Sequence, residues 1–124
     1  MMAKIAIVIL SSSDTPEGRG RMVHAMTAVQ ELIDSGYEVK ILFEGIGVTW
    51  IDAFHRADHP FTQNYGPKFE AIKPHILGAC NFCTTVRFEV GDSVNAVGID
   101  LLGEDGGRFS VGNLVVEGYQ IINY

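Results

Sequence analysis

Cysteines, charged residues and long hydrophobic runs are all scarce in this chain. Two of its 124 residues are cysteines and 19% are charged. No apolar run approaches the ~20 residues needed to span a bilayer, and the apolar segment 5–10 follows no basic leader of a signal peptide. Apolar residues make up 47% of the sequence, enough for a core without disulfides or metals. The sequence therefore predicts one soluble, cytoplasmic domain over residues 1–124 that does not bind a membrane.

Basic residues are also few. Nine Lys and Arg stand against 15 Asp and Glu, which gives a net charge of −6 and a pI of about 5.0. The densest basic group is only Arg19 and Arg21, so we expect no nucleic-acid partner. The charged fraction is low for a small monomer, and we therefore expect a homo-oligomer that buries apolar surface between its subunits. The sequence contains one apolar cluster that can form either the contact between subunits or part of the core. It consists of Trp50, Ile51, Phe54 and Phe61.

Apolar runs alternate with segments of helical periodicity. Residues 11–20, which contain Pro16 and two glycines, are predicted to form a loop. The alternation predicts βαβ units in a flavodoxin-like three-layer sandwich with a mostly parallel sheet of about five strands and helices on both faces. The strand ending at Ala79 is expected inside the sheet. Strands are predicted at residues 4–10, 37–43, 75–79, 97–102 and 119–124, and helices at 22–33, 48–57, 65–72, 80–88 and 110–117.

Reactive groups in such sheets gather outside the carboxyl ends of the strands. The serine- and threonine-rich residues 11–15 follow the first strand, and their hydroxyls and amides can form an anion-binding nest. Asp14 and Glu17 would repel a phosphate there. Arg19 and Arg21 compensate only if they turn inward, and an ordinary polar crossover loop is the alternative. The other segments at this edge are residues 44–48 and 80–83.

Cys80 and Cys83 lie three residues apart at the end of the third predicted strand. In a reducing compartment such a pair is more often catalytic, redox-active or metal-binding than structural. If a helix begins here, its free N–H groups and its dipole favour the thiolate. We therefore expect the pKa of Cys80 to lie below its ordinary value. The alternative is that both cysteines are small, packed core residues.

His59 is a third candidate site residue, as a base or as a partner of the thiolate. His55 lies four residues earlier, but Pro60 argues against one helix that carries both histidines. A surface or helix-end histidine is the alternative. Two cysteines cannot form a four-ligand zinc site alone, and the histidine spacing matches no zinc pattern. We therefore predict no metal and no cofactor.

Several motifs, taken in order, resemble one known family. They are His24-Ala25, Gly-Tyr-Glu-Val-Lys at 36–40, His59-Pro60-Phe61, Gly-Ala-Cys-Asn-Phe-Cys at 78–83, and the ending at 116–122. The combination resembles the DsrE-like proteins, which include sulfur-relay subunits, along nearly the whole chain. The resemblance implies a flavodoxin-like layered fold, homotrimers or hexamers, and other sulfur-relay proteins as partners. It also implies persulfide sulfur on the cysteine after the third strand, the position that Cys80 matches best.

The first functional hypothesis is therefore a sulfur carrier or sulfurtransferase-like enzyme. In it, Cys80 carries sulfane sulfur as a persulfide and Cys83 assists or resolves it. One alternative is a non-catalytic oligomeric binding module with packed cysteines. The other is a dithiol redox protein that cycles a Cys80–Cys83 disulfide. The reactivity of Cys80 separates the first hypothesis from the binding module.

Overall fold

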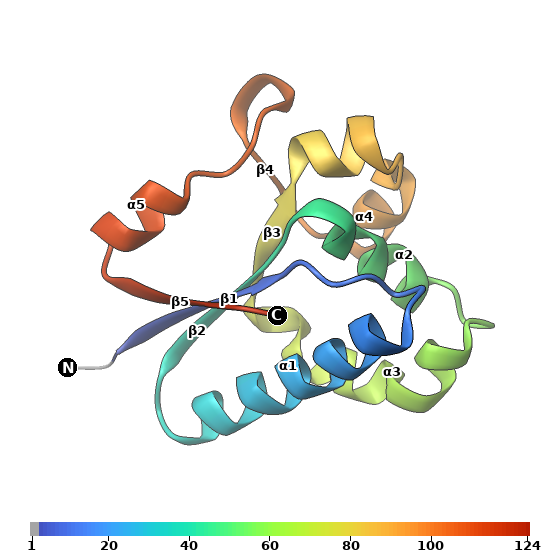
Figure 1. Cartoon of the computed structure of the whole chain (residues 1–124), viewed down its shortest axis with the longest axis horizontal. Helices are drawn as coiled ribbons and strands as arrows, with labels where there is room; N and C mark the ends of the chain where they lie inside the picture. Colours follow the sequence, from blue (N-terminus) through green and yellow to red (C-terminus); the bar gives the residue numbers. More distant parts are fainter. Residues whose placement is uncertain (1–2) are drawn as a thin grey trace.

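A computed structural model of the chain describes residues 3–124. Over this range five strands form one parallel sheet in the order β4-β3-β2-β1-β5 (Figure 1). Strand β3 lies between β2 and β4, so the expectation that the strand ending at Ala79 is inside the sheet is confirmed. The strands are β1 (Lys4–Ile9), β2 (Glu38–Phe43), β3 (Ile76–Cys80), β4 (Leu101–Leu102) and β5 (Tyr119–Asn123).

Helical segments connect these strands, and the parallel α/β fold predicted from the sequence is confirmed. No helix of the described range is long and apolar enough to cross a membrane. The segments are α1 (Pro16–Asp34), the 3₁₀ turn η1 (Gly45–Val48), α2 (Thr49–His55), α3 (Pro60–Ile72), the 3₁₀ turn η2 (Lys73–His75), the π-helical η3 (Cys83–Arg87), α4 (Gly91–Val97), the 3₁₀ turn η4 (Glu104–Gly106) and α5 (Val111–Val116).

Strand β1 is hydrogen-bonded along both of its edges. It pairs with β2 over its whole length and with β5 from Lys4 to Val8. Residues 5–9 are all buried, because helices cover both faces of the sheet at this strand. A continuous β-branched run is the pattern expected of such a doubly covered parallel strand.

The two faces of the sheet are covered unequally. From β1 the chain moves across the sheet to β2, then β3, then β4, each time to the next strand on the same side. Because the crossovers between parallel strands are right-handed, the helices of these three connections lie on the same face of the sheet. Helices α1 to α4 accordingly share one core with the sheet. The last connection returns past β1 to β5, and α5 lies on the opposite face (Figure 1). The order thus differs from the 2-1-3-4-5 order of flavodoxin. The small cluster beneath α5 consists of Ala6, Val8, Leu42 and Leu114.

The aromatic cluster considered as a subunit contact lies inside the larger core, so of the two interpretations the core is correct. Trp50 and Ile51 are completely buried. The Trp50 ring lies 4.6 Å from that of Phe61 and 5.8 Å from that of Phe54, measured between centroids. Tilted pairs of this kind contribute roughly 0.5–1.5 kcal/mol each beyond their buried area. The cluster therefore joins α2 to α3 instead of one subunit to another.

Several element boundaries differ from those predicted, and α3, for example, begins at Pro60 and not at residue 65, because His59 Nδ1 caps it. Helix α1 begins at Pro16, inside the segment predicted as a loop, because Thr15 Oγ1 accepts the N–H of Gly18 at 3.0 Å and caps the helix. Helix α4 (Gly91–Val97) forms mostly over residues to which the sequence assigns no element. Because α4 extends to Val97, it occupies the start of the predicted strand 97–102, and β4 keeps only two residues.

Gly18 permits a close approach between α1 and the loop before it. A Cβ atom at this position would lie 1.9 Å from the main-chain oxygen of Ser12. Gly20 belongs to the same helix, and the position of its Cβ has nothing within 4 Å. The two glycines therefore form a matched pair, one required by packing and one not.

We expect Gly18→Ala to lower the free energy of unfolding by roughly 1–3 kcal/mol, the range for overpacking. Gly20→Ala should raise it by roughly 0.4–1 kcal/mol, because alanine restricts the unfolded chain. Urea unfolding followed by circular dichroism measures both changes. Equal effects of the two substitutions would contradict the close contact at Gly18.

Candidate functional site

The structure brings the two predicted site cysteines into contact. Cys80 ends β3 and Cys83 begins η3, so a single turn joins them at the carboxyl edge of the sheet. The backbone N–H and the thiol of Cys83 both act on the pKa of the Cys80 thiol, so the two residues lie next to each other in this turn. Both are free thiols with 0% of their surface exposed. They form a dithiol pair inside the larger core.

The turn after β3 ends in a π-helix. The Phe88 N–H donates to the Cys83 carbonyl, five residues earlier, at 3.0 Å. Single π-turns are rare and occur frequently at functional sites. Thr84 follows Cys83 and is completely buried, and its hydroxyl has no hydrogen-bond partner within residues 3–124. An unpaired buried group of this kind costs roughly 1–3 kcal/mol, so the turn retains a polar group that its own packing does not satisfy.

Two segments flank the cysteine turn. On one side, η1 packs against η3. On the other side, the Asn81 Nδ2 group donates to the Gly103 carbonyl at 3.2 Å, and the Phe82 N–H donates to the Gly107 carbonyl at 3.0 Å. The Arg108 guanidinium lies 5.1 Å from the centroid of the Phe82 ring, a cation–π contact. Residues 103–108 are thus fastened to the two residues between the cysteines.

Burial raises the pKa of the Cys80 thiol above its ordinary value. Desolvation is the largest cause, and the thiol of Cys83 and the carboxylate of Glu44 raise the pKa further. The backbone N–H of Cys83 acts in the opposite direction. The expectation that the pKa of Cys80 is lowered is therefore wrong. The backbone N–H of Cys83 does act to lower this pKa, but the loss of hydration on burial raises it by more. The Cys80 thiol is therefore protonated at neutral pH.

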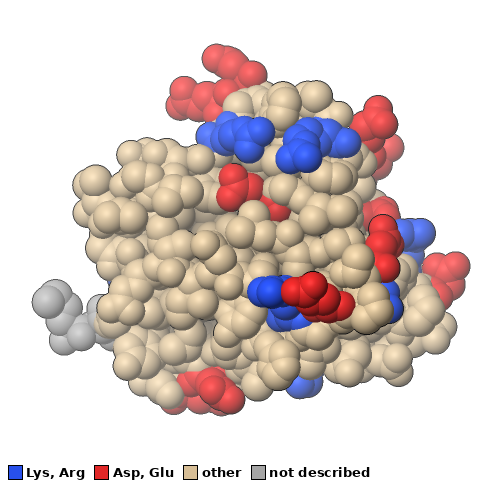
Figure 2. All heavy atoms as spheres, viewed as in Figure 1, with Lys and Arg blue, Asp and Glu red and all other residues tan. Residues whose placement is uncertain are grey.

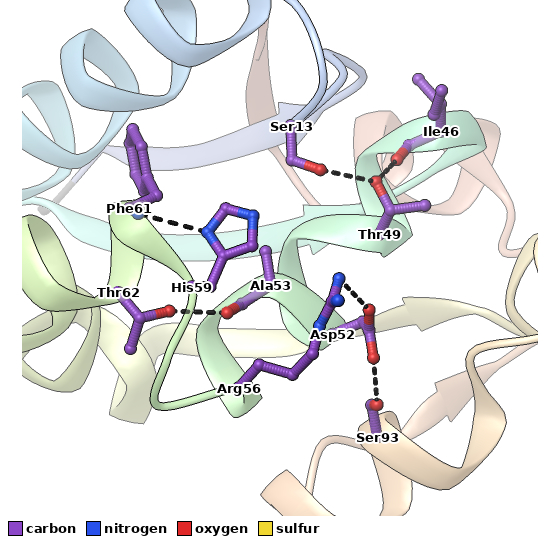
Figure 3. A network of polar contacts seen from close by, with 10 residues as sticks. All are labelled: Ser13, Ile46, Thr49, Asp52, Ala53, Arg56, His59, Phe61, Thr62 and Ser93. Atoms are coloured by element: carbon purple, nitrogen blue, oxygen red, sulfur yellow. Dashed lines mark hydrogen bonds and ion pairs between the residues drawn. The ribbon is translucent and has the colours of Figure 1, made fainter.

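His59 caps the N-terminus of α3 (Figure 3). Its Nδ1 atom accepts the N–H of Phe61 at 3.2 Å, and Pro60 occupies the first helical position. His55 ends α2, so the two histidines lie on different helices, as Pro60 indicated. Within the described range, no hydrogen bond joins His59 to Cys80, and His59 is not among the groups that shift the pKa of that thiol. The structure thus gives His59 a capping contact away from the dithiol.

A polar network ties together the segments at this edge (Figure 3). The hydroxyls of Ser13 and Thr49 lie 3.5 Å apart, which connects the loop after β1 to the start of α2. Ser93 Oγ donates to the Asp52 carboxylate at 2.6 Å and connects α4 to α2. Asp52 also pairs with Arg56 at 2.9 Å. The loop after β1 is therefore anchored to the helical layer that surrounds the cysteine turn.

The sequence placed residue 44 at this edge of the sheet, but two residues of the site, Glu44 and Thr84, had no predicted role. Glu44 directly follows β2, and β2 pairs in parallel with β3. Because Cys80 ends β3, the parallel pairing could have indicated that Glu44 lies near Cys80. Thr84 carried no comparable signal, because its neighbour Thr85 is exposed while Thr84 itself is buried. Only the packing of the π-turn distinguishes the two threonines.

The pKa of Cys80 predicts how stability depends on pH. Because the folded-state pKa is raised, the native state holds this proton more tightly than the unfolded state does. The resulting stability is present below the unfolded thiol pKa of about 8.5 and is lost as pH rises through the folded pKa. We expect urea-unfolding free energies to fall more steeply between pH 7 and pH 10 in the unmodified chain than in Cys80→Ala. Parallel curves would contradict the raised pKa.

The geometry of the site is the evidence for function, since comparisons with known proteins do not add to it. No family model, no curated protein and no solved structure matches the chain. The similarity to DsrE-like proteins stays a prediction from motifs.

Proposed function

We propose that the protein is a sulfur carrier whose dithiol takes up sulfane sulfur on Cys80 as a persulfide. The observation that carries this proposal is the contact of the two thiols at the end of β3. That edge is where parallel sheets hold their reactive groups. The motif order that resembles DsrE-like sulfur-relay proteins supports the proposal, and so do the π-turn and the unpaired hydroxyl of Thr84.

Uptake is a thiolate exchange. Cys80 first loses its proton to solvent, and its thiolate attacks the outer sulfur of a donor persulfide, RS–SH. A new S–S bond forms on Cys80, the S–S bond of the donor breaks, and RS⁻ leaves with the electron pair. No net oxidation takes place. The raised pKa keeps the thiolate scarce while the site is closed, so the dithiol has to reach solvent before it reacts.

Residues 103–108 offer the route to solvent. The backbone there includes Gly103 at φ 117° and Gly106 at φ 75°, and Asp105, a non-glycine residue, lies at φ 51°. The preceding strand β4 has only two residues. Short, weakly paired segments open at a lower free energy than the whole domain. Breaking the two hydrogen bonds to Asn81 and Phe82 would release this segment from the cysteine turn.

Cys83 gives the persulfide two fates. An acceptor thiolate that attacks the outer sulfur takes the sulfur over and leaves Cys80 as a thiolate. Alternatively, the Cys83 thiolate attacks the Cys80 sulfur, expels HS⁻ and forms the Cys80–Cys83 disulfide. In that case the two cysteines lose two electrons and the sulfane sulfur gains them. A low-molecular-weight thiol reductant then restores the dithiol.

Complete burial favours a second function, a binding module whose cysteines are packed core residues. Reactive cysteines are generally partly exposed and lie in electropositive surroundings. Here both thiols are buried, and the charge that acts on Cys80 is the carboxylate of Glu44. The two functions differ in one measurable property, the reactivity of the thiols in the native protein.

Incubation with a low-molecular-weight persulfide tests the sulfur-carrier function. We expect Cys83→Ser to gain about 32 Da, the mass of one sulfur atom, and to lose it again with dithiothreitol. The unmodified chain should instead proceed to the disulfide and release sulfide. Cys80→Ser should gain no mass. Intact-protein mass spectrometry measures all three.

The matched control is iodoacetamide labelling of the same variants, with and without urea. If Cys83→Ser gains no sulfur and alkylates only after unfolding, the sulfur-carrier function is wrong and the packed-cysteine module is right. Circular dichroism checks that each variant is folded.

We also propose that copies of the chain associate through the outer surface of α5. Val115 and Val116 are 59% and 86% exposed there, and α5 contains no charged residue. Figure 2 shows no charged side chain over α5 in this view, although charges surround other parts of the molecule. A second copy with the same uncharged surface complements this one, whereas a strongly charged partner does not. The low charged fraction of the chain agrees with burial of such a surface.

Sedimentation at micromolar concentration tests the association. We expect an oligomer for the unmodified chain and a 13.5 kDa monomer after Val115→Lys combined with Val116→Lys. Lysines in the contact would place like charges against each other across the symmetric interface. Val86→Lys is the control, because Val86 is 60% exposed but lies on η3. A monomeric unmodified chain would contradict the proposal.

A further inference from the structure

The two edges of the sheet are built differently. Strand β4 forms one edge and has only two residues, whereas β5 forms the other edge and has five. The edge of a sheet presents unpaired N–H and C=O groups to any strand that can pair with them. Proteins commonly guard such edges with very short strands, lysine, proline or β-bulges. The edge at β4 is guarded by its shortness, so β5 is the edge that offers a row of main-chain groups.

Strand β5 has none of these protections. Its sequence is Tyr-Gln-Ile-Ile-Asn, without a charged residue or a proline. It pairs with β1 in an unbroken register from Tyr119 to Asn123, so no bulge turns the strand away. Gln120, Ile122 and Asn123 are exposed. The segments of residues 3–124 that surround β5 therefore leave its outer edge accessible along most of its length.

The hydrogen bonds of Tyr124 show which residues of β5 face outward. The Tyr124 N–H donates to the Val8 carbonyl at 2.8 Å, and the Tyr124 carbonyl accepts the Leu10 N–H at 2.7 Å. Both main-chain groups of a strand residue point to the same side, and the side alternates from one residue to the next. Even-numbered residues of the strand therefore bond to β1, and odd-numbered residues point away from the sheet. The outward residues are Tyr119, Ile121 and Asn123.

We propose that β5 pairs with β5 of a second copy of the chain, antiparallel and about a twofold axis. In an antiparallel pair, opposite residues at alternate positions exchange both of their N–H···O bonds. All three outward residues find partners when Ile121 lies on the axis opposite its own copy and Tyr119 lies opposite Asn123. The two sheets then become one continuous sheet across a closed, isologous contact.

The charges around β5 favour a second copy as the partner. The whole chain has a net charge of −6, but β5 itself is uncharged, so two copies meet here without like charges opposite each other. The nearest charges along the chain and the sheet are Glu117 and Lys4, whose Nζ lies 5.0 Å from the centroid of the Tyr119 ring. Both lie at the start of β5. Antiparallel pairing places them beside the uncharged end of the strand in the second copy.

This pairing gives the proposed self-association a geometry, and it rests on that association but not on the α5 contact itself. A twofold axis perpendicular to the sheet leaves each face of the sheet on its own side, so both copies of α5 lie on one face of the continuous sheet. Helix α5 packs next to β5 in each copy (Figure 1). The exposed Val115 and Val116 therefore lie on an element that adjoins the paired edge.

Amide hydrogen exchange of the unmodified chain tests the pairing directly. We expect the N–H groups of Ile121 and Asn123 to exchange at least about tenfold more slowly in concentrated protein, which sediments as an oligomer, than in dilute protein. Gln120 and Ile122 are internal controls, because their bonds to β1 protect them at both concentrations. Fast exchange of Ile121 and Asn123 in the oligomer would overturn the strand pairing and leave the α5 contact standing. A chain that is monomeric at every concentration would overturn both.

Two substitutions at Asn123 isolate the main-chain hydrogen bond. Asn123→Pro removes an outward N–H, and proline is tolerated in an edge strand at such a position. Asn123→Ala is the matched control, because it removes the same side chain and keeps the N–H. We expect Asn123→Pro to raise the dissociation constant of the dimer roughly tenfold, since one hydrogen bond is lost on each side of the axis, and Asn123→Ala to change it little. Sedimentation measures both, and circular dichroism checks that Asn123→Pro is folded. Equal dissociation constants for the two variants would overturn the strand pairing.

Discussion

The pairing of β1 with β2 on one edge and with β5 on the other positions every functional segment of this protein. It requires the chain to cross the sheet three times in one direction and then return. Because crossovers are right-handed, the return changes the face as well as the edge. One face therefore carries four helices and a deep core, and the other carries α5 alone. The carboxyl edge is divided in the same way, with the cysteines above β3 and a cavity of about 310 Å³ between the loop after β1 and the end of β5.

The thick helical layer explains why the cysteines are protected. The backbone N–H of Cys83 acts to lower the pKa of the Cys80 thiol, but it does so inside the core. Desolvation outweighs it, and burial of the turn keeps the Cys80 thiol protonated. Both thiols are shielded from solvent in this conformation. For the proposed sulfur carrier, access of solvent past residues 103–108 would therefore control the reaction.

The sequence predicted the layers of this fold better than its details. The run in β1 and the helical spacing of Met22, Met26 and Val29 identify a parallel sheet covered by helices, because both patterns follow from burial alone. The start of α1 was missed since Gly18 and Gly20 look like loop residues. Gly18 is there for the close approach of Ser12, a contact that local sequence does not reveal. For the site, a spacing of three residues was enough to bring Cys80 and Cys83 together. The direction of the pKa shift depends on packing from distant segments and could not be read from spacing.

Trp50 occupies a special place in this arrangement. It is the one tryptophan in the sequence, it is completely buried, and its indole N–H donates to the carbonyl of Ser11 in the loop after β1. The emission of an indole changes with the polarity and hydrogen bonding around it. Any event that shifts the loop after β1 therefore acts on a single fluorophore without competing signals. The fold thus contains a built-in optical reporter for this edge of the sheet, and binding or opening there can be followed in the unlabelled protein.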